Sequence, residues 1–559
     1  MSTQTTLYSY NSSIKNDKVK INNHKAKAYS KFYRMHKYWS KKPYNIIKQF
    51  IEKYSDEKDI ILDPFNGSGV SVSESIFNGR KGFGIDINPS AIFITEQQLN
   101  KIDIGKFEKE FRNIEKELKQ KINSFYSLNI NNQKETVTHF IWEGDKINEI
   151  WYKKANKKVV VFPSEEDYKL YNSFSYDNIF LFYPKEQFFT NSRINAKNEK
   201  HVYELFTPRN LLGLSLLMDR IEKIKDENIK NMFKLCFTGA TGQASKMVFV
   251  INRKDKYGNI KKEVGSWVIG YWIPKENMEI NVWNCFNNRY NTILKAKKEY
   301  GKLDINIKKT NKFEDLLTSS NLLLINEASQ IALQKIPSES IDYIITDPPH
   351  GDRQPYLELS MMWNSWLKKE HEINYENEII ISNAKKRNKN IENYHELLNN
   401  VLDEIERVLK YGKYFSLMFN SIDDKTWTNL ITYVNTLNFK IEKIETLNYS
   451  ANSVIQDNRK GGLKTDFILT FKKSKKEFKE VKFVKMKENN QLFIDIINSH
   501  LKRNTNGLET YELLNYLIHE FLNNHEFFKL SEVLKLLKDN FKTKNGKWSL
   551  LNEGYENGI

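Results

Sequence analysis

The sequence predicts an α/β fold built around a mostly parallel sheet, because two separate stretches alternate buried strands with helices. Within residues 59–88, the strand DIILDPF, the turn GSG, the helix VSVSESIFNG and the strand KGFGIDIN follow one another. The alternation resumes near residue 321 with NLLLINEAS and SIDYIITDPPH. Such units imply parallel strands joined by crossover helices. The last two predicted strands, NFKIEKIETL and TDFILTFKK, have the length and spacing of an antiparallel pair that closes the sheet.

The pattern divides the chain of 559 residues into five regions, more than one ordinary domain would need. Residues 1–30 are polar and rich in Asn and Lys, and we expect a mobile tail there. The α/β core is split into residues 31–100 and 321–478. An inserted region, 101–320, lies between these halves, and a smaller unit covers residues 485–559.

The inserted region is predicted to mix helices and strands. Apolar residues recur at spacings of three and four between Phe107 and Phe125, as in an amphipathic helix. A second helix begins at TPRNLLGLSLLMDRIEKI, where Thr207 is the expected N-cap and Pro208 the first helical residue. The segments KKVVVFP, NIFLFYP, KMVFVINR and SWVIGYWIP are predicted to be strands.

The C-terminal unit is predicted to hold two helices and a short strand, in the segments YELLNYLIHEFL, FFKLSEVLKLLKDNF and NGKWSL. This order resembles part of a winged helix. A plain helical cap on the core explains it equally well.

Composition narrows the class of protein. The formal net charge of +17 indicates a polyanionic partner such as nucleic acid, although a genome-wide preference for Lys would give the same value. The two cysteines, Cys236 and Cys285, lie in no CxxC or Cys/His cluster, so neither zinc nor a disulfide framework is expected. The sequence shows neither a signal peptide nor an apolar run of membrane-spanning length. We therefore expect a soluble, cytoplasmic protein with no membrane partner.

The turn DPFNGSG, residues 63–69, is the first candidate for ligand binding. Gly67 and Gly69 would let the backbone approach a ligand, and Asp86 at the end of the next strand could accept hydrogen bonds from both hydroxyls of a ribose. A GxG turn alone is weak support, because many α/β proteins use glycine there only to bend. The sequence has no GxGxxG or GxxxxGK[ST] motif, which argues against a dinucleotide and a triphosphate. A carboxylate at Asp63 would favour a cationic nucleoside instead.

The turn IITDPPHGDRQ, residues 344–354, is the second candidate. Two prolines stiffen the exit from a strand, so the Asp347 side chain and the Pro348 carbonyl are expected to face one point. Two converging acceptors would bind a group with two donor hydrogens, such as an exocyclic amine. A strand cap followed by a rigid turn is the plainer alternative.

These motifs resemble the amino-methylating, S-adenosylmethionine-dependent DNA methyltransferases, whose hallmark is DPPY or a close variant. The blocks HKYWSKKP, FNGRKGFGIDINPSAIF, FTPRNLLGL, SIDYIITDPPHGDRQPYLELSMMW and GLKTDFILTF are similar, in order, to a subgroup of adenine-specific methylases with a large insertion. The resemblance implies a Rossmann-like class I methyltransferase sheet. It also implies that residues 31–100 bind the cofactor, that 101–320 recognise the target, and that 321–478 carry the DPPH motif.

The resemblance places individual residues by their match to these blocks. Lining the methionine end and the ribose of S-adenosylmethionine would be His36, Lys42, Pro43, Asp63, Phe65, Gly67, Gly69 and Asp86. Ala328 and Ser329 would flank its adenine, a looser match. The target amine would bind at Asp347, Pro348, Pro349 and His350, with Asn420 on the pocket floor as an alternative to a simple strand end.

His350 departs from the family pattern, which has Tyr, Phe or Trp after the second proline. Three interpretations stay open: His350 stacks on the flipped base less strongly, Tyr356 takes over the stacking, or the site is weakened. The charged segments RKDK, 253–256, and KKRNK, 385–389, are interpreted as solvated loops unless they line a cleft.

The resemblance implies methyl transfer to the exocyclic amine of a flipped base in double-stranded DNA, adenine N6 ahead of cytosine N4. RNA guanine-N2 methylation and a catalytically silent DNA-binding protein on the same scaffold are the alternatives. A restriction endonuclease partner is left open, since the chain shows no convincing nuclease motif.

Overall fold

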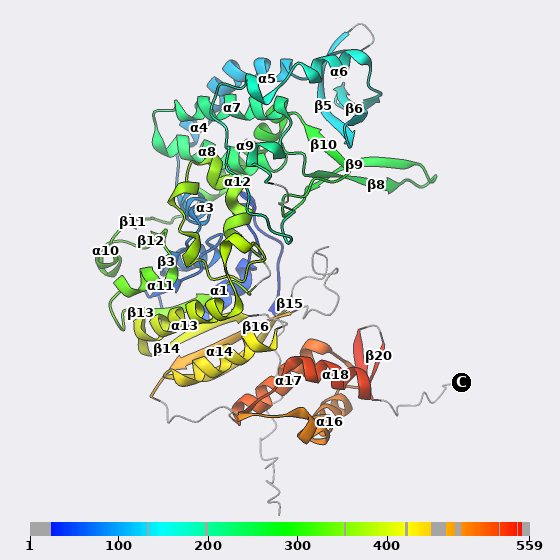
Figure 1. Cartoon of the computed structure of the whole chain (residues 1–559). Coiled ribbons are helices and arrows are strands. Elements are labelled where there is room, and N and C mark those ends of the chain that lie inside the picture. Colours follow the sequence, from blue (N-terminus) through cyan, green and yellow to red (C-terminus); the bar gives the residue numbers. More distant parts are fainter. Residues whose placement is uncertain are drawn as a thin grey trace, which may run out of the picture.

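The computed structural model describes residues 24–130, 133–195, 199–351, 354–419, 423–448, 465–475, 482–524, 526–544 and 546–550. Most of the expected N-terminal tail, residues 1–30, and Asn420 lie outside this part of the chain. In Figure 1 the inserted region occupies one end of the molecule, the large sheet the middle and the C-terminal unit the other end.

The central sheet has nine strands in the order β1-β15-β16-β14-β13-β2-β3-β12-β11. Neighbouring strands run parallel except at β16, which is antiparallel to β14 and β15, so the predicted Rossmann-like sheet with a reversed strand is confirmed. Both halves of the core meet at its centre, where β2 pairs with β13 and β3 with β12. The strands are β1 (His24–Lys25), β2 (Ile60–Asp63), β3 (Lys81–Ile85), β11 (Lys309–Thr310), β12 (Leu322–Ile325), β13 (Ile341–Thr346), β14 (Leu409–Phe419), β15 (Phe439–Asn448) and β16 (Thr465–Lys473).

Helices cover both faces of this sheet, which explains why its central strands are continuously apolar. Because side chains alternate along a strand, Ile61 and Ile345 pack on one face and Leu62 and Ile344 on the other. The first face is covered by α1 (Tyr44–Tyr54), α2 (Val70–Phe77) and α3 (Pro89–Leu99), and the second by α10 (Phe313–Thr318), α11 (Ser329–Ala332), α13 (Ile391–Val408) and α14 (Asp424–Thr436).

The inserted region has its own sheet, in the order β7-β6-β5-β10-β8-β9, with β4 paired to β5. Its interior holds a fully buried ion pair, Arg209 with Glu279 at 2.7 Å. The strands are β4 (Ser127–Ile130), β5 (Gln133–Glu143), β6 (Lys146–Lys154), β7 (Lys157–Val161), β8 (Val248–Lys254), β9 (Ile260–Trp267) and β10 (Glu276–Ile280). The helices are α4 (Ile104–Ile114), α5 (Gln120–Ser124), α6 (Glu165–Asn172), α7 (Pro208–Glu222), α8 (Glu227–Thr241) and α9 (Val282–Tyr300).

Local predictions for the insertion are mostly confirmed, with two corrections. Thr207 caps α7 by accepting a hydrogen bond from the Asn210 amide at 3.2 Å. The segment NIFLFYP is not a strand: Phe180 is 93% exposed, and no neighbouring strand is available to pair with it in the described structure. In SWVIGYWIP the strand ends at Trp267.

The C-terminal unit contains one helix more than the sequence indicated, α16 (Met486–Arg503), beside α17 (Thr510–Asn523) and α18 (Leu530–Asn540). Short strands β18 (Leu508–Glu509), β20 (Lys542–Lys544) and β21 (Lys547–Ser549) form a three-stranded sheet, and β17 (Lys482–Phe483) pairs with β19 (Glu526–Phe527). The unit thus combines three helices with short paired strands, where the sequence indicated two helices and one strand. Asp424 of the core accepts the Ser531 amide at 3.1 Å, which attaches α18 to α14.

Candidate functional site

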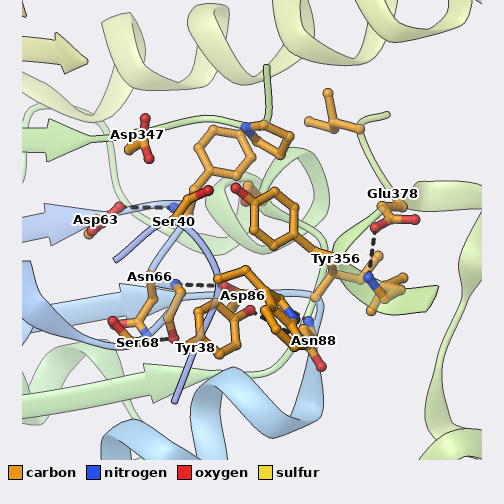
Figure 2. A pocket seen from close by; sticks show the side chains of 18 of the residues that line it. Tyr38, Ser40, Asp63, Asn66, Ser68, Asp86, Asn88, Asp347, Tyr356 and Glu378 are labelled. Atoms are coloured by element: carbon orange, nitrogen blue, oxygen red, sulfur yellow. Dashed lines mark hydrogen bonds between the residues drawn. The ribbon is translucent and has the colours of Figure 1, made fainter. Parts of the chain in front are cut away.

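A pocket of about 870 Å³, including its open mouth, lies at the carboxyl ends of β2, β3, β12 and β13. Crevices at this edge of an open parallel sheet are where such folds bind ligands. In Figure 2, the carboxylates of Asp63 and Asp347 lie on one side of the pocket and that of Glu378 lies on the other. Of the residues predicted from the sequence, ten line the pocket: Lys42, Asp63, Phe65, Gly67, Asp86, Ala328, Ser329, Asp347, Pro349 and Tyr356.

Asp86 follows β3 and is held by the backbone. Its Oδ2 accepts the Gly67 amide at 2.7 Å and its Oδ1 accepts the Asn88 amide at 2.9 Å. Burial raises the pKa of Asp86 to about 7, although these two N–H donors act to lower it. A ligand with hydroxyl donors or positive charge would favour the ionised form.

Asp63 ends β2 and joins the two halves of the core. Its Oδ1 accepts the Phe65 amide at 3.1 Å and the Thr346 hydroxyl at 2.7 Å, and Thr346 is the last residue of β13. Burial raises the pKa of Asp63 to about 6, with the hydroxyls of Thr346 and Ser71 lowering it. The cofactor-side turn and the DPPH turn are therefore in direct contact.

The two glycines of DPFNGSG have different functions. Gly67, with φ of +51°, lines the pocket, and a Cβ there would lie 3.4 Å from the Tyr38 ring. Gly69, with φ of +72°, lies outside the lining, and its Cβ would lie 2.3 Å from a Thr95 side-chain atom. Gly69 is thus needed for packing of α2 against α3.

The segment HKYWSKKP forms one wall of the pocket through Tyr38 and Lys42. His36 does not reach the pocket: its ring packs edge-on against Trp363, and its Nε2 lies 3.1 Å from the Thr238 hydroxyl of the inserted region. Burial lowers the pKa of His36 to about 3, so the imidazole is neutral. Pro43 is also absent from the lining and instead precedes α1 as its N-cap.

Ala328 and Ser329 also line the pocket. Ala328 is the N-cap of α11, and the Ser329 hydroxyl donates to the Pro64 carbonyl. This bond ties the end of β12 to the DPFNGSG turn, so both residues are well positioned beside a ligand.

Asp347 follows β13 with a side chain only 15% exposed. Its Oδ2 lies 3.0 Å from Lys42 Nζ, and its Oδ1 lies 3.1 Å from His350 Nε2. The His350 contact is not an aligned hydrogen bond, because neither ring nitrogen has a hydrogen-bond partner among the described residues. Lys42 thus places a primary ammonium beside the carboxylate predicted to bind an amine.

The rest of the DPPH turn is fixed by its surroundings. The Pro349 carbonyl accepts the Tyr394 hydroxyl at 2.7 Å, and Pro348 is buried behind the pocket. The His350 ring meets Phe419 edge-on, with centroids 5.3 Å apart, and does not line the pocket. Tyr356, the first residue of α12 (Tyr356–Trp366), does line it, with a ring nearly parallel to that of Tyr38.

The loop after the DPPH turn is held by a buried arginine, which corrects the interpretation of KKRNK as solvated. Arg387 pairs with Glu358 at 2.9 Å and with Glu378 at 2.5 Å. Glu378 lines the pocket and accepts the Leu357 amide at 3.0 Å. Asn191 of the inserted region donates to Glu358 at 2.7 Å. The insertion therefore contacts α12, the helix that follows the DPPH turn.

Sequence reasoning missed other residues that line the pocket, among them Tyr38, Asn88 and Glu378. Tyr38 and Asn88 were inside the recognised blocks. The side-chain amide of Asn88 donates a hydrogen bond to the Tyr38 hydroxyl at 3.0 Å. Glu378 lies in ENEIIIS, where no motif indicates a function. In the described part of the chain, no group of three or more His, Cys, Asp and Glu side chains could hold a metal, and no helix is long and apolar enough to cross a bilayer.

A family model described as DNA methylase matches residues 5–97 and 341–546, more than half of the chain. The protein belongs to this DNA methylase family. The matched segments contain both DPFNGSG and the DPPH turn, and the inserted region lies between them. The predicted family is thereby confirmed.

Curated relatives agree with this family. The chain is 27% identical over 206 residues to the type II methyltransferase M.MjaII of Methanocaldococcus jannaschii, covering 35% of this chain and 37% of that one. It is 21% identical over 331 residues to the type II methyltransferase M.MvaI of Kocuria varians, covering 58% and 54%. The matches thus span about a third to a half of these relatives. A solved S-adenosylmethionine-dependent methyltransferase from Methanosarcina mazei is 12% identical with a TM-score of 0.16, covering 33% of this chain and 79% of that one.

Proposed function

We propose that this DNA methylase transfers a methyl group from S-adenosylmethionine to an exocyclic amine of double-stranded DNA, adenine N6 ahead of cytosine N4. The observation that carries this proposal is the position of Asp347. Its carboxylate borders the same pocket as Asp63 and Asp86 and already faces an amine-type donor, the Lys42 ammonium, at 3.0 Å.

The pocket fits the cofactor. Asp86 is oriented by two backbone amides toward ligand hydroxyls, and Gly67 leaves room that any larger residue would fill. Asp63 and Asp86 would favour a cationic ligand, and Ala328 and Ser329 would flank its base. When bound there, S-adenosylmethionine would supply the methyl group.

The chain's own residues would prepare the target amine. Asp347 accepts a hydrogen bond from the amine, which orients its lone pair, while the rigid prolines hold the carboxylate in place. An acid at this position supports adenine over cytosine. The base must leave the duplex to reach this depth. Tyr356 lines the pocket and His350 does not, which supports the interpretation that Tyr356 rather than His350 stacks on the base.

We assign target recognition to the inserted region, residues 101–320 apart from β11, which belongs to the central sheet, and α10, which covers that sheet. We assign the remaining catalytic parts to residues 31–100 and 321–478. Asn191 supports this assignment because it couples the insertion to the loop behind the DPPH turn. The type II names of the curated relatives support a search for a restriction endonuclease partner.

The proposed reaction can be tested in a host that expresses the protein. Its genomic DNA is sequenced with a method that detects modified bases. We expect one modified sequence motif with the native protein and none with Asp347→Ala. Asp403→Ala, on the outer side of α13, is a matched carboxylate control that should keep the modification. A motif modified by both the native protein and Asp347→Ala would refute the proposed site. No modification with either would contradict DNA as the substrate.

A further inference from the structure

We propose that the β8–β9 hairpin is a second DNA-binding element, a ribbon that enters the major groove beside the flipped base. The proposal rests on duplex DNA being the substrate and adds the surface that holds the duplex. The proposal is based on the exposure and the positive charge of this hairpin, since binding of ligands in the pocket requires neither.

The hairpin extends beyond the sheet that supports it. Near its base, β8 pairs with β10 only at Val248 and Phe249, whereas its outer residues 252–261 are all exposed. Figure 1 shows the two strands projecting from the inserted region. Five residues beyond Phe249 reach about 17 Å at ~3.3 Å per residue. A two-stranded ribbon of this kind fits the major groove of B-form DNA, which is about 12 Å wide.

The base of the hairpin touches the wall of the pocket. Trp267, the last residue of β9, packs edge-on against Trp39 with centroids 5.5 Å apart, and Trp39 lines the pocket. Trp267 also fills the space beside Gly242, where a Cβ would lie 2.5 Å from the indole. A duplex whose base enters the pocket would therefore pass close to this hairpin.

The tip of the hairpin is a turn in which the Asp255 carboxylate binds backbone amides of the turn itself. Asp255 Oδ1 accepts the amides of Tyr257 at 2.8 Å and Asn259 at 2.9 Å, and Gly258 has φ of +86°. The turn presents Tyr257 at 76% exposure, with Ile260 at 64% beside it. Two large exposed side chains at a rigid tip can contact base edges and sugars without ordering a loop first.

The charge on the outer part of the ribbon favours phosphate. Arg253 lies directly opposite Lys261 in the β8–β9 register, and like charges in that position destabilise a hairpin. Glu263 compensates Arg253 at 3.2 Å. In the described structure, Lys254, Lys256 and Lys261 have no carboxylate within ion-pair distance. Lys262, nearer the base, differs because Glu149 and Glu276 neutralise it.

Duplex DNA is therefore the partner that this ribbon fits best. Phosphates on both sides of the groove would relieve the repulsion between the cations, while the tip faces the bases. The deep and narrow major groove of double-stranded RNA would not admit the ribbon.

The ribbon proposal can be tested by measuring how the full-length chain binds a DNA duplex of about three helical turns. Fluorescence anisotropy gives the affinity over a range of salt concentrations, without cofactor. The triple variant Lys254→Gln, Lys256→Gln, Lys261→Gln should lower the slope of log affinity against log salt by about 3. The matched control Lys109→Gln, Lys116→Gln, Lys121→Gln removes the same charge from exposed positions on and after α4. The control should keep the native slope, and both variants should keep the native melting temperature.

An unchanged slope in the ribbon variant, or an equal decrease in the control, would overturn the proposal. Dimethyl sulfate footprinting on the modified motif then locates the groove: the native ribbon should protect guanine N7, and protection of adenine N3 instead would contradict the major groove. Because binding is measured without cofactor, it separates the two proposals. If Asp347→Ala does not methylate DNA but keeps the native salt slope, the ribbon proposal stands. If the ribbon variant keeps both the native salt slope and DNA methylation, only the ribbon proposal is refuted.

Discussion

The two ends of the pocket, the proposed cofactor end at Asp86 and the proposed target end at Asp347, differ in which groups contact their carboxylates. At the cofactor end, both oxygens of Asp86 accept backbone amides, so the acceptor geometry is set by the chain itself. At the target end, Asp347 contacts only side chains in the described structure, the Lys42 ammonium and the His350 ring. Backbone donors make a site rigid before its ligand arrives, whereas side-chain partners can be exchanged for the ligand. We expect the cofactor end to control affinity and the target end to control turnover.

The largest effect is expected at the target end. Asp347→Ala should lower the methylation rate by about 10²- to 10³-fold, since it removes the acceptor that orients the amine. The dissociation constant of S-adenosylmethionine should stay within a few-fold of the native value. Rates of methyl incorporation and calorimetric binding measure the two quantities. A parallel loss of cofactor affinity would contradict the division between the two ends.

The converse result is expected at the cofactor end. Asp86→Asn removes a charged acceptor held by Gly67 and Asn88, and should weaken S-adenosylmethionine binding roughly 10- to 100-fold. The rate at saturating cofactor should remain near native. Initial rates over a range of cofactor concentrations separate the two, and a fall in the maximal rate alone would argue against ribose binding by Asp86.

Cofactor affinity should also depend on pH through the same end. Burial raises the pKa of Asp63 to about 6 and that of Asp86 to about 7, so both carboxyls of the free protein hold protons above their ordinary pKa. A cationic ligand favours the ionised forms, so its affinity should rise with pH through this range, by up to roughly tenfold per unit for each proton released. The free folded state binds more protons than the unfolded chain there, so this contribution to its stability decreases as pH rises. Calorimetry on native protein and Asp86→Asn measures the effect, and an equally steep dependence in the variant would exclude Asp86 as a source.

The contact between the two ends gives a smaller effect. Thr346→Val keeps the shape of the side chain but removes the hydroxyl that donates to Asp63 at 2.7 Å, and should weaken cofactor binding by roughly tenfold. Thr346→Ser, which retains the hydroxyl, is the matched control and should bind within about twofold of native. A native affinity in Thr346→Val would show that the hydrogen bond to Asp63 is not needed for cofactor binding.

The smallest effect is expected at His350. Its ring already packs edge-on against Phe419 outside the pocket lining, so His350→Tyr should preserve or modestly raise the methylation rate. His350→Phe, which lacks any polar atom, controls for the contact with Asp347. A large loss in both variants, measured as rates at saturating DNA, would show that the imidazole acts on Asp347.

The motifs at strand ends could be located from the sequence because their geometry is local. A parallel strand followed by a tight turn places Asp63, Asp86 and Asp347 at one edge of the sheet, whatever surrounds them. The helix cap at Thr207 and the antiparallel closing pair were predictable for the same reason. Membership of a motif did not show the role of every residue. His36 lies in one of the same blocks, yet its ring contacts the Thr238 hydroxyl. A Cβ at Gly69 would meet the Thr95 side chain.

By itself, the sequence determined the α/β class, the split core and the positions of the pocket carboxylates, since periodicity and turn chemistry act over a few residues. Only the tertiary structure decided which side chains meet across long separations. The contacts of Lys42 with Asp347 and of Asn191 with Glu358 join segments far apart in the chain. The same is true of the ribbon. Among the described residues, Lys254 and Lys261 have no acidic partner, whereas Lys262 pairs with Glu149 and Glu276 from other strands of the insertion. Charge and burial depend on those distant neighbours, which the order of residues does not show.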